Sequence, residues 1–370
     1  MDYTELKNEM QKQKPEYSHG ERVRKYFSGE EVDYQPYVLL APYQALSEVY
    51  GFTTKEMDNN FEIYSKIIEA GREDYEIEGV NVRLSLRSMG AAMGSELNIP
   101  DHGIDSVEKH ILQDYEDWGK MIEIDPYNNE ILTPMLETAR KLKDRFPEMT
   151  LSTGVVGPFS TAVAVRPIEN ILRDTRKNPE KLKELLKLCV DNSLKWVEVF
   201  TKEFGKAGPS CSDPVTCTDI LSEKQFCEFS LPEMKRLFNG LTEITGIKPS
   251  LHICGHTKGI WKYFPEMEIG SFSVDDCEDL LELKEALGET MVISGNVPPV
   301  NVLRFGKIDD VIDSVKDCLR KAADSPKGFM LSSGCQIPIG TPKENLDALV
   351  YAVRKYGRGA KIGELPKGLK

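Results

Sequence analysis

Short apolar runs alternate with amphipathic segments over the C-terminal two-thirds of the chain. Six of these runs predict strands, at residues 151–159, 206–214, 249–255, 270–277, 291–297 and 328–335. The longest amphipathic segment, residues 178–204, has helical periodicity that places apolar residues on one face: Leu182, Leu185, Leu186, Cys189 and Leu194. Residues 222–244 predict another helix, with Ser222 as its N-cap, and residues 308–323 predict a third. The pattern therefore predicts repeated strand–helix units.

Two further apolar runs, at residues 36–42 and 81–88, bring the number of predicted strands to eight. Strands that alternate with helices form a parallel sheet, and eight such units are typical of a (β/α)8 TIM barrel. We expect one domain over residues 1–370. Its N-terminal residues 1–34 are expected to form helices outside the barrel, and residues 89–118 an insertion after the second strand. An open doubly wound sheet is the rival fold, but no G-x-G-x-x-G motif follows the first strand.

The composition is that of a folded, acidic protein. Of the 370 residues, 40% are hydrophobic and 29% are charged, and the formal net charge is −13. Because binding to nucleic acid or to an anionic membrane needs clustered Lys and Arg, neither partner is expected. The N-terminal segment lacks an apolar signal-peptide core, and no apolar run approaches the length of a membrane span, so a cytoplasmic location is expected. The eight cysteines are therefore expected to be thiols or ligands rather than disulfides.

Polar residues stand at the ends of the predicted strands. They are Asp213, His252, Cys254, Asp275, Asp276, Asn296 and Cys335. In a TIM barrel the carboxyl ends of the strands carry the chemistry, so the pattern predicts that these side chains collect in one barrel mouth.

The H-x-C pair of His252 and Cys254 is the sharpest of these signals. Residues two apart in a strand point to the same side, and an imidazole nitrogen beside a thiolate suits zinc. Cys335, at the end of the last predicted strand, would complete a Cys2His set, which leaves the open fourth position typical of catalytic zinc. The competing interpretation is ordinary: a single Cys or His on a barrel strand is usually a core or mouth residue. His256 shares the parity of the pair, but Gly255 is expected to end the strand and to carry His256 into the loop at the barrel mouth.

The acidic strand ends allow more than one role. Asp275 or Asp276 could supply a labile fourth oxygen ligand or orient His252, and otherwise would be an ordinary helix cap. Asp213 could handle a proton or bind substrate, and otherwise would cap the turn that opens with Pro214.

Several stretches resemble the uroporphyrinogen decarboxylase superfamily, and within it the zinc- and corrinoid-dependent methyltransferases. They are "SLHICGHT" (250–257), "FSVDD" (272–276), "VISGNVPPVNVL" (292–303) and "MLSSGCQIPIGTPKENLDALVYAVRKYG" (330–357). The resemblance covers roughly residues 20–357. The decarboxylases themselves carry an arginine-rich motif of the form "RQAGRY" near the first strand, where this chain reads "PYVLLAPYQAL", so porphyrin decarboxylation is disfavoured.

The resemblance implies zinc bound by His252, Cys254 and Cys335, and an acidic ligand near Asp275 when substrate is absent, with Asp276 and Glu278 as alternatives. It also implies a partner, a cobalamin-binding corrinoid protein that docks on the barrel mouth. On this basis Asp213, Asp275 and His256 are expected to act in catalysis, and Asn296 to contact the corrinoid cofactor.

Two directions of methyl transfer fit these residues. In the first, a methoxylated aromatic is demethylated and its methyl group passes to cob(I)alamin. In the second, methyl-cob(III)alamin methylates a thiol such as coenzyme M. Because the expected mouth is apolar and has few cations, we expect the first direction, with a substrate site at Tyr43, Met89, Met93, Phe159 and Met330. A non-catalytic barrel that only binds a corrinoid protein is a further alternative.

Overall fold

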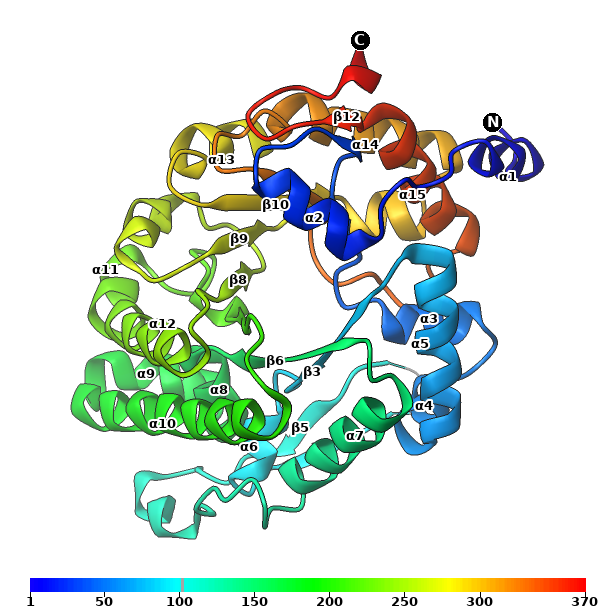
Figure 1. The fold of residues 1–370 in the computed structure, drawn as a ribbon. Helices are drawn as coiled ribbons and strands as arrows, with labels where there is room; N and C mark the ends of the chain where they lie inside the picture. The colour runs from blue at the N-terminus through cyan, green and yellow to red at the C-terminus, as the bar shows by residue number, and fades with distance from the viewer. Residues whose placement is uncertain (101–102) are drawn as a thin grey trace. The chain divides into compact units, whose positions relative to one another are not determined.

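The computed structural model describes residues 1–100 and 103–370, and Figure 1 shows its helices and strands. Eight parallel strands follow one another in the order β2-β11-β10-β9-β8-β7-β6-β3. They are β2 (Tyr37–Val38), β3 (Gly79–Arg83), β6 (Thr150–Val156), β7 (Ser210–Ser212), β8 (Ser250–Ile253), β9 (Ser271–Val274), β10 (Val292–Val297) and β11 (Phe329–Ser333). Each predicted run overlaps one of these strands, although β3 and β6 begin before their predicted runs. The strand order, in which the first strand lies beside the last, is that of a (β/α)8 fold. The predicted fold class is confirmed.

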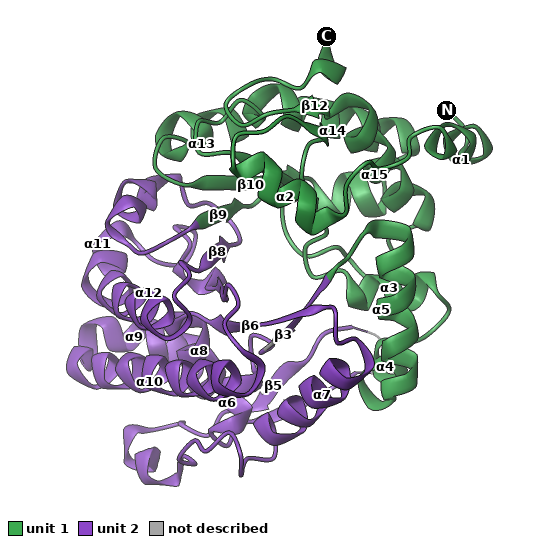
Figure 2. Ribbon diagram, in the orientation of Figure 1, with its two compact units in different colours: residues 1–78, 271–370 green, residues 79–270 purple. Residues whose placement is uncertain are grey.

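The chain divides into two compact units, coloured separately in Figure 2. Unit 1 comprises Met1–Glu78 and Ser271–Lys370, and unit 2 comprises Gly79–Gly270. Unit 1 contains β2, β9, β10 and β11, and unit 2 contains β3, β6, β7 and β8, so each contains four parallel strands.

Unit 1 contains the two ends of the chain. Its other elements are α1 (Tyr3–Gln11), α2 (His19–Phe27), β1 (Val32–Tyr34), α3 (Tyr43–Val49), α4 (Thr54–Asn59), α5 (Phe61–Tyr75), α13 (Leu280–Leu287), η5 (Pro299–Arg304), α14 (Ile308–Ala322), α15 (Lys343–Tyr356), β12 (Arg358–Ala360) and η6 (Lys367–Leu369). The predicted helix at residues 308–323 is α14, which packs against α15. Its apolar residues Val311, Val315 and Leu319 are fully buried, as the 3.6-residue period requires.

The N-terminal segment is partly helical, as expected, but it also contains a strand. Val32–Tyr34 forms β1 and pairs antiparallel with β12. The guanidinium of Arg22 on α2 is fully buried, and it pairs with Asp33 of this strand at 2.7 Å and with Glu76 at 2.9 Å. These long-range pairs hold residues 32–34 extended, and local periodicity in the sequence does not reveal them.

Unit 2 contains the longest helix. Its other elements are α6 (Ser88–Ala92), β4 (Glu96–Asn98), β5 (Ser106–Lys109), η1 (Tyr115–Lys120), α7 (Leu132–Arg145), α8 (Pro158–Val165), α9 (Ile168–Lys177), α10 (Pro179–Phe204), η2 (Pro214–Thr216), α11 (Glu223–Gln225), η3 (Phe226–Ser230), α12 (Leu231–Thr245) and η4 (Lys258–Glu266). The predicted insertion at residues 89–118 contains the antiparallel pair β4–β5. The second strand was predicted to reach residue 88, but β3 ends at Arg83, because Ser88 opens α6 and its hydroxyl accepts a hydrogen bond from the Ser85 N–H.

Two predicted helices of unit 2 are confirmed with changes. Along α10, Leu182, Leu185, Leu186 and Cys189 are buried as expected, whereas Leu194 is only half-buried and packs against Gly240 of α12. Ser222 is indeed an N-cap, in a capping box with Gln225. The segment that follows is not one regular helix. A π-helical turn (η3) separates α11 from α12, next to Pro232, which cannot donate a backbone hydrogen bond.

In the part of the chain that the structure describes, no helix is long and apolar enough to cross a membrane.

Candidate metal centre

His252 and Cys254 form a donor pair at the carboxyl end of β8. The strand buries Leu251 and Ile253 on one side, so His252 points to the other side, and Cys254 directly follows the last strand residue. Both side chains are half-buried, and His252 Nε2 lies 3.2 Å from Cys254 Sγ. Two donors on one tetrahedral zinc ion, at usual Zn–N and Zn–S distances, stand about 3.5 Å apart. The pair therefore fits a zinc ion with little adjustment.

The loop after this pair turns at Gly255, as the sequence predicted. Gly255 has φ +78°, and a Cβ there would lie 2.7 Å from Asp219 Oδ2. His256 is exposed, and its Nδ1 lies 2.9 Å from Asp219 Oδ1, while its backbone N–H donates to Asp219 Oδ2. These hydrogen bonds lower the pKa of the Asp219 carboxyl. The sequence pattern does not reveal Asp219, because the bond joins two loops 37 residues apart.

Cys335 lies in unit 1, beside the acidic loop that follows β9. Gly334 packs so closely on this loop that a Cβ there would lie 2.6 Å from the Asp276 backbone nitrogen. Burial raises the pKa of the Asp276 carboxyl, and the charge of Asp275 and, to a smaller degree, that of Cys335 raise it further. Of the three acidic candidates, Asp276 thus has the clearest contact with the Cys335 segment. Glu278 is buried, and Asp275 Oδ1 accepts a hydrogen bond from the Cys277 N–H at 3.2 Å.

Asn296 braces this acidic loop. Its amide nitrogen donates to the carbonyl oxygens of Asp275 and Glu278, at 3.2 and 2.9 Å, and the Cys318 thiol donates to its amide oxygen at 3.7 Å. The polar atoms of the side chain are therefore used inside unit 1. The expected contact of Asn296 with a corrinoid stays a prediction.

Asp213 is fully buried behind the carboxyl ends of β6 and β7. Its Oδ1 accepts hydrogen bonds from the Ser160 N–H at 2.9 Å and the Ser160 hydroxyl at 2.6 Å, so it caps the first turn of α8. It does not cap the Pro214 turn through its side chain. Oδ2 is buried and has no hydrogen-bond partner among the described residues. Burial raises the pKa of this carboxyl to about 6, against the hydrogen bonds from Ser160.

The expected substrate contacts occupy different environments. Tyr43 opens α3 and packs edge-to-face on Tyr64, with ring centroids 5.7 Å apart, and it is half-buried, as is Met330 on β11. By contrast, Met89, Met93 and Phe159 are almost completely buried core residues of unit 2. Their apolar character is explained by packing alone, and contact with a substrate stays a prediction for all five residues.

Comparison with known proteins identifies the family. The model of the family "Uroporphyrinogen decarboxylase (URO-D)" matches residues 18–356. A methylcobamide:CoM methyltransferase of Methanosarcina acetivorans is 25% identical over 345 residues, 92% of this chain and 99% of the relative. A methylcobamide:CoM methyltransferase of Methanosarcina barkeri is 24% identical over 84% of this chain and 89% of the relative.

A solved structure has the same fold over nearly the whole chain. It is a methyltransferase from Methanosarcina mazei, which superposes with a TM-score of 0.78 at 24% identity and covers 92% of this chain and 99% of that one. Since the family model spans most of the chain and the expected superfamily is confirmed, the chain belongs to the uroporphyrinogen decarboxylase (URO-D) family.

Proposed function

We propose that this chain is a zinc-dependent methyltransferase that transfers a methyl group from methyl-cob(III)alamin, carried by a corrinoid protein, to a thiol such as coenzyme M. The observation that carries the proposal is the His252–Cys254 pair, whose donor atoms stand 3.2 Å apart at the carboxyl end of β8. Active sites of (β/α)8 enzymes lie at the carboxyl ends of the strands.

The proposed ligands are the His252 imidazole and the thiolates of Cys254 and Cys335. Three protein ligands leave one position for a substrate, which is the catalytic rather than the structural arrangement. When bound, zinc keeps a thiol substrate in its thiolate form at neutral pH. Asp276, next to the Cys335 segment, is the proposed source of an oxygen ligand when substrate is absent, in place of the expected Asp275.

The direction of transfer differs from the sequence expectation. The relatives from Methanosarcina acetivorans and Methanosarcina barkeri are named methylcobamide:CoM methyltransferases, which supports the alternative direction over O-demethylation. The expectation rested partly on Met89, Met93 and Phe159 as an apolar substrate site, and these residues are buried in the core. The corrinoid is therefore proposed as methyl donor rather than acceptor.

The test combines metal content with turnover. The purified chain is expected to bind about one zinc per chain and to consume methylcobalamin in the presence of coenzyme M, followed by the change in cobalamin absorbance. His252→Ala and Cys335→Ser each remove one of the three proposed ligands, and each is expected to lower zinc affinity and turnover at least tenfold. Cys277→Ser is the matched control, because Cys277 is an exposed thiol within the acidic loop that is not one of the proposed ligands.

Three outcomes would count against the proposal. Unchanged zinc content and turnover in His252→Ala would remove the site. Formation of methylcobalamin from cob(I)alamin and methoxyarenes, without thiol methylation, would restore the O-demethylase direction. Binding of a corrinoid protein without any methyl transfer would leave a non-catalytic binding barrel.

A further inference from the structure

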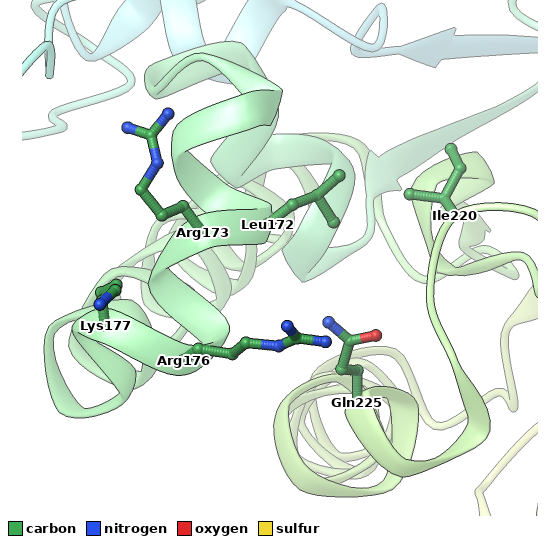
Figure 3. Close-up of a pocket in the computed structure, with 6 residues that line it drawn as sticks. All are labelled: Leu172, Arg173, Arg176, Lys177, Ile220 and Gln225. Atoms are coloured by element: carbon green, nitrogen blue, oxygen red, sulfur yellow. The ribbon is translucent and has the colours of Figure 1, made fainter.

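A basic surface pocket lies on unit 2, between the C-terminal turns of α9 and the segment that follows β7. It has a volume of about 480 Å³ and is lined by Leu172, Arg173, Arg176, Lys177, Ile220 and Gln225 (Figure 3). Arg176 extends across it towards Gln225, while Leu172 and Ile220 provide an apolar wall. Gln225 is fixed by a hydrogen bond from its amide to the Thr175 hydroxyl at 3.0 Å, which joins the two sides of the pocket.

The three cations of this pocket lack acidic partners among the described residues. Arg173, Arg176 and Lys177 are exposed. Among residues 1–100 and 103–370, their side chains make one hydrogen bond, from Arg173 Nη1 to the Asn170 amide oxygen. Three acids near these residues in the chain are paired elsewhere: Asp174 with Arg166, Glu180 with Lys183 and Glu223 with Lys262. Glu169 is exposed one turn before Arg173, and among the described residues it makes no ion pair with it. The helix dipole favours cations in the last turn of a helix. It does not by itself account for three cations around one pocket. The chain as a whole has a net charge of −13, so a basic cluster without acidic partners differs from the rest of its surface. Such a cluster attracts an acidic partner.

The pocket is connected by short contacts to the loop of the candidate metal ligands. Ile220 directly follows Asp219, which holds the imidazole of His256. The Thr218 N–H and hydroxyl both donate to the His256 carbonyl at 2.8 Å, and His256 is two residues from Cys254. The other wall, α9, follows α8, which begins two residues after β6 ends. Both walls therefore belong to the segments that leave the carboxyl ends of β6 and β7.

We propose that this basic pocket docks carboxylate side chains on the surface of the corrinoid-carrying partner protein. The inference rests on the proposed function, because a corrinoid protein must reach the carboxyl ends of the strands to deliver its methyl group. An apolar centre with basic residues at its rim is typical of a protein interface. Complementary charges at the rim mainly raise the rate of association. Ile220 and Leu172 are the apolar centre, and the three cations are the rim.

The experiment compares two methyl donors. Arg173→Glu/Arg176→Glu is assayed with a methylated corrinoid protein that the wild-type chain accepts, and with free methylcobalamin, which needs no docking. With the protein donor at low salt, kcat/KM is expected to fall roughly tenfold or more, and the salt dependence of the wild type is expected to disappear. With free methylcobalamin the rate is expected to stay within about twofold of wild type. Lys187→Glu/Lys202→Glu, at two exposed positions of α10, makes the same change in net charge and is expected to behave as wild type with both donors.

The outcomes separate this proposal from the function on which it rests. Absence of thiol methylation by the wild type with either donor would overturn the proposed function. The docking proposal is wrong if the arginine variant and the α10 control lose the same activity with the protein donor, or if the wild type uses free methylcobalamin but no corrinoid protein. Equal losses with both donors in the arginine variant would also refute docking, and circular dichroism of that variant would then report whether it has unfolded.

Discussion

Asp213 is a buried carboxyl with one oxygen in use and one without a hydrogen bond. Its Oδ1 accepts two hydrogen bonds from Ser160, and its Oδ2 is enclosed without a hydrogen-bond partner among the described residues. An unsatisfied buried oxygen disfavours the ionised form, which is why the pKa of Asp213 rises to about 6. The residue acts first on the structure, by holding the start of α8, and its expected catalytic role stays a prediction.

The raised pKa of Asp213 predicts a particular pH dependence of stability. The folded chain binds more protons at this carboxyl than the unfolded chain between about pH 4 and pH 6. Its contribution to stability is therefore fully present below about pH 4 and is lost as the pH rises through 6, a loss of about 3 kcal/mol. Asp213→Asn has no carboxyl at this position, so it should not show this loss. We therefore compare the free energy of unfolding of the wild type with that of the variant. The difference, wild type minus variant, should fall by about 3 kcal/mol between pH 4 and pH 7. Urea unfolding at several pH values measures it, and parallel curves would contradict the prediction.

At the scale of the element, α8 is a helix enclosed by unit 2. Seven of its eight residues are buried, so solvent cannot satisfy the free N–H groups of its first turn. Asp213 supplies the acceptor from a different strand end, and a carboxylate at a helix N-terminus is also favoured by the helix dipole. Gly157, the N-cap residue, leaves the space that this carboxylate occupies, because a Cβ there would lie 2.3 Å from it.

Gly157→Ala is therefore expected to destabilise the chain. The added methyl group must displace either Asp213 or the first turn of α8, at a cost of about 1–3 kcal/mol or more. Gly119→Ala is the matched control, since no atom lies within 4 Å of its added Cβ, and it should change stability by no more than about 0.5 kcal/mol. Thermal and urea unfolding of both variants compare the two costs. Equal stability of the two variants would show that Asp213 does not hold this position.

At the scale of the whole molecule, we expect the fold to form without a metal. Each unit has its own apolar core, and the candidate ligands are half-buried at strand ends rather than central to either core. The eight-stranded sheet is built from backbone hydrogen bonds between parallel strands, which need no metal ion. Zinc would therefore act in catalysis rather than in folding.

Removal of zinc should accordingly stop turnover without unfolding the chain. After treatment with a chelator, far-UV circular dichroism should be unchanged, while methylation of coenzyme M should be lost and should return when zinc is added. Loss of secondary structure on chelation would instead assign the metal a structural role.

The sequence by itself determined the strand–helix repeat, the eight strands and the H-x-C pair. These features depend on spacing within a few residues, since a period of 2 or 3.6 selects the buried side of an element whatever lies opposite it. Met89, Met93 and Phe159 show the limit of such patterns, because an apolar residue near a strand end serves a core as readily as a substrate.

Only the tertiary structure decided which distant residues meet. The cap of Asp213 on α8, the bond between Asp219 and His256, the strand β1 held by Arg22 and the basic pocket beside α9 each join residues from separate elements. Their positions depend on strand register and on how helices pack, which no local period encodes. The sequence thus supplied the donor types of the candidate site, and the fold supplied their neighbours.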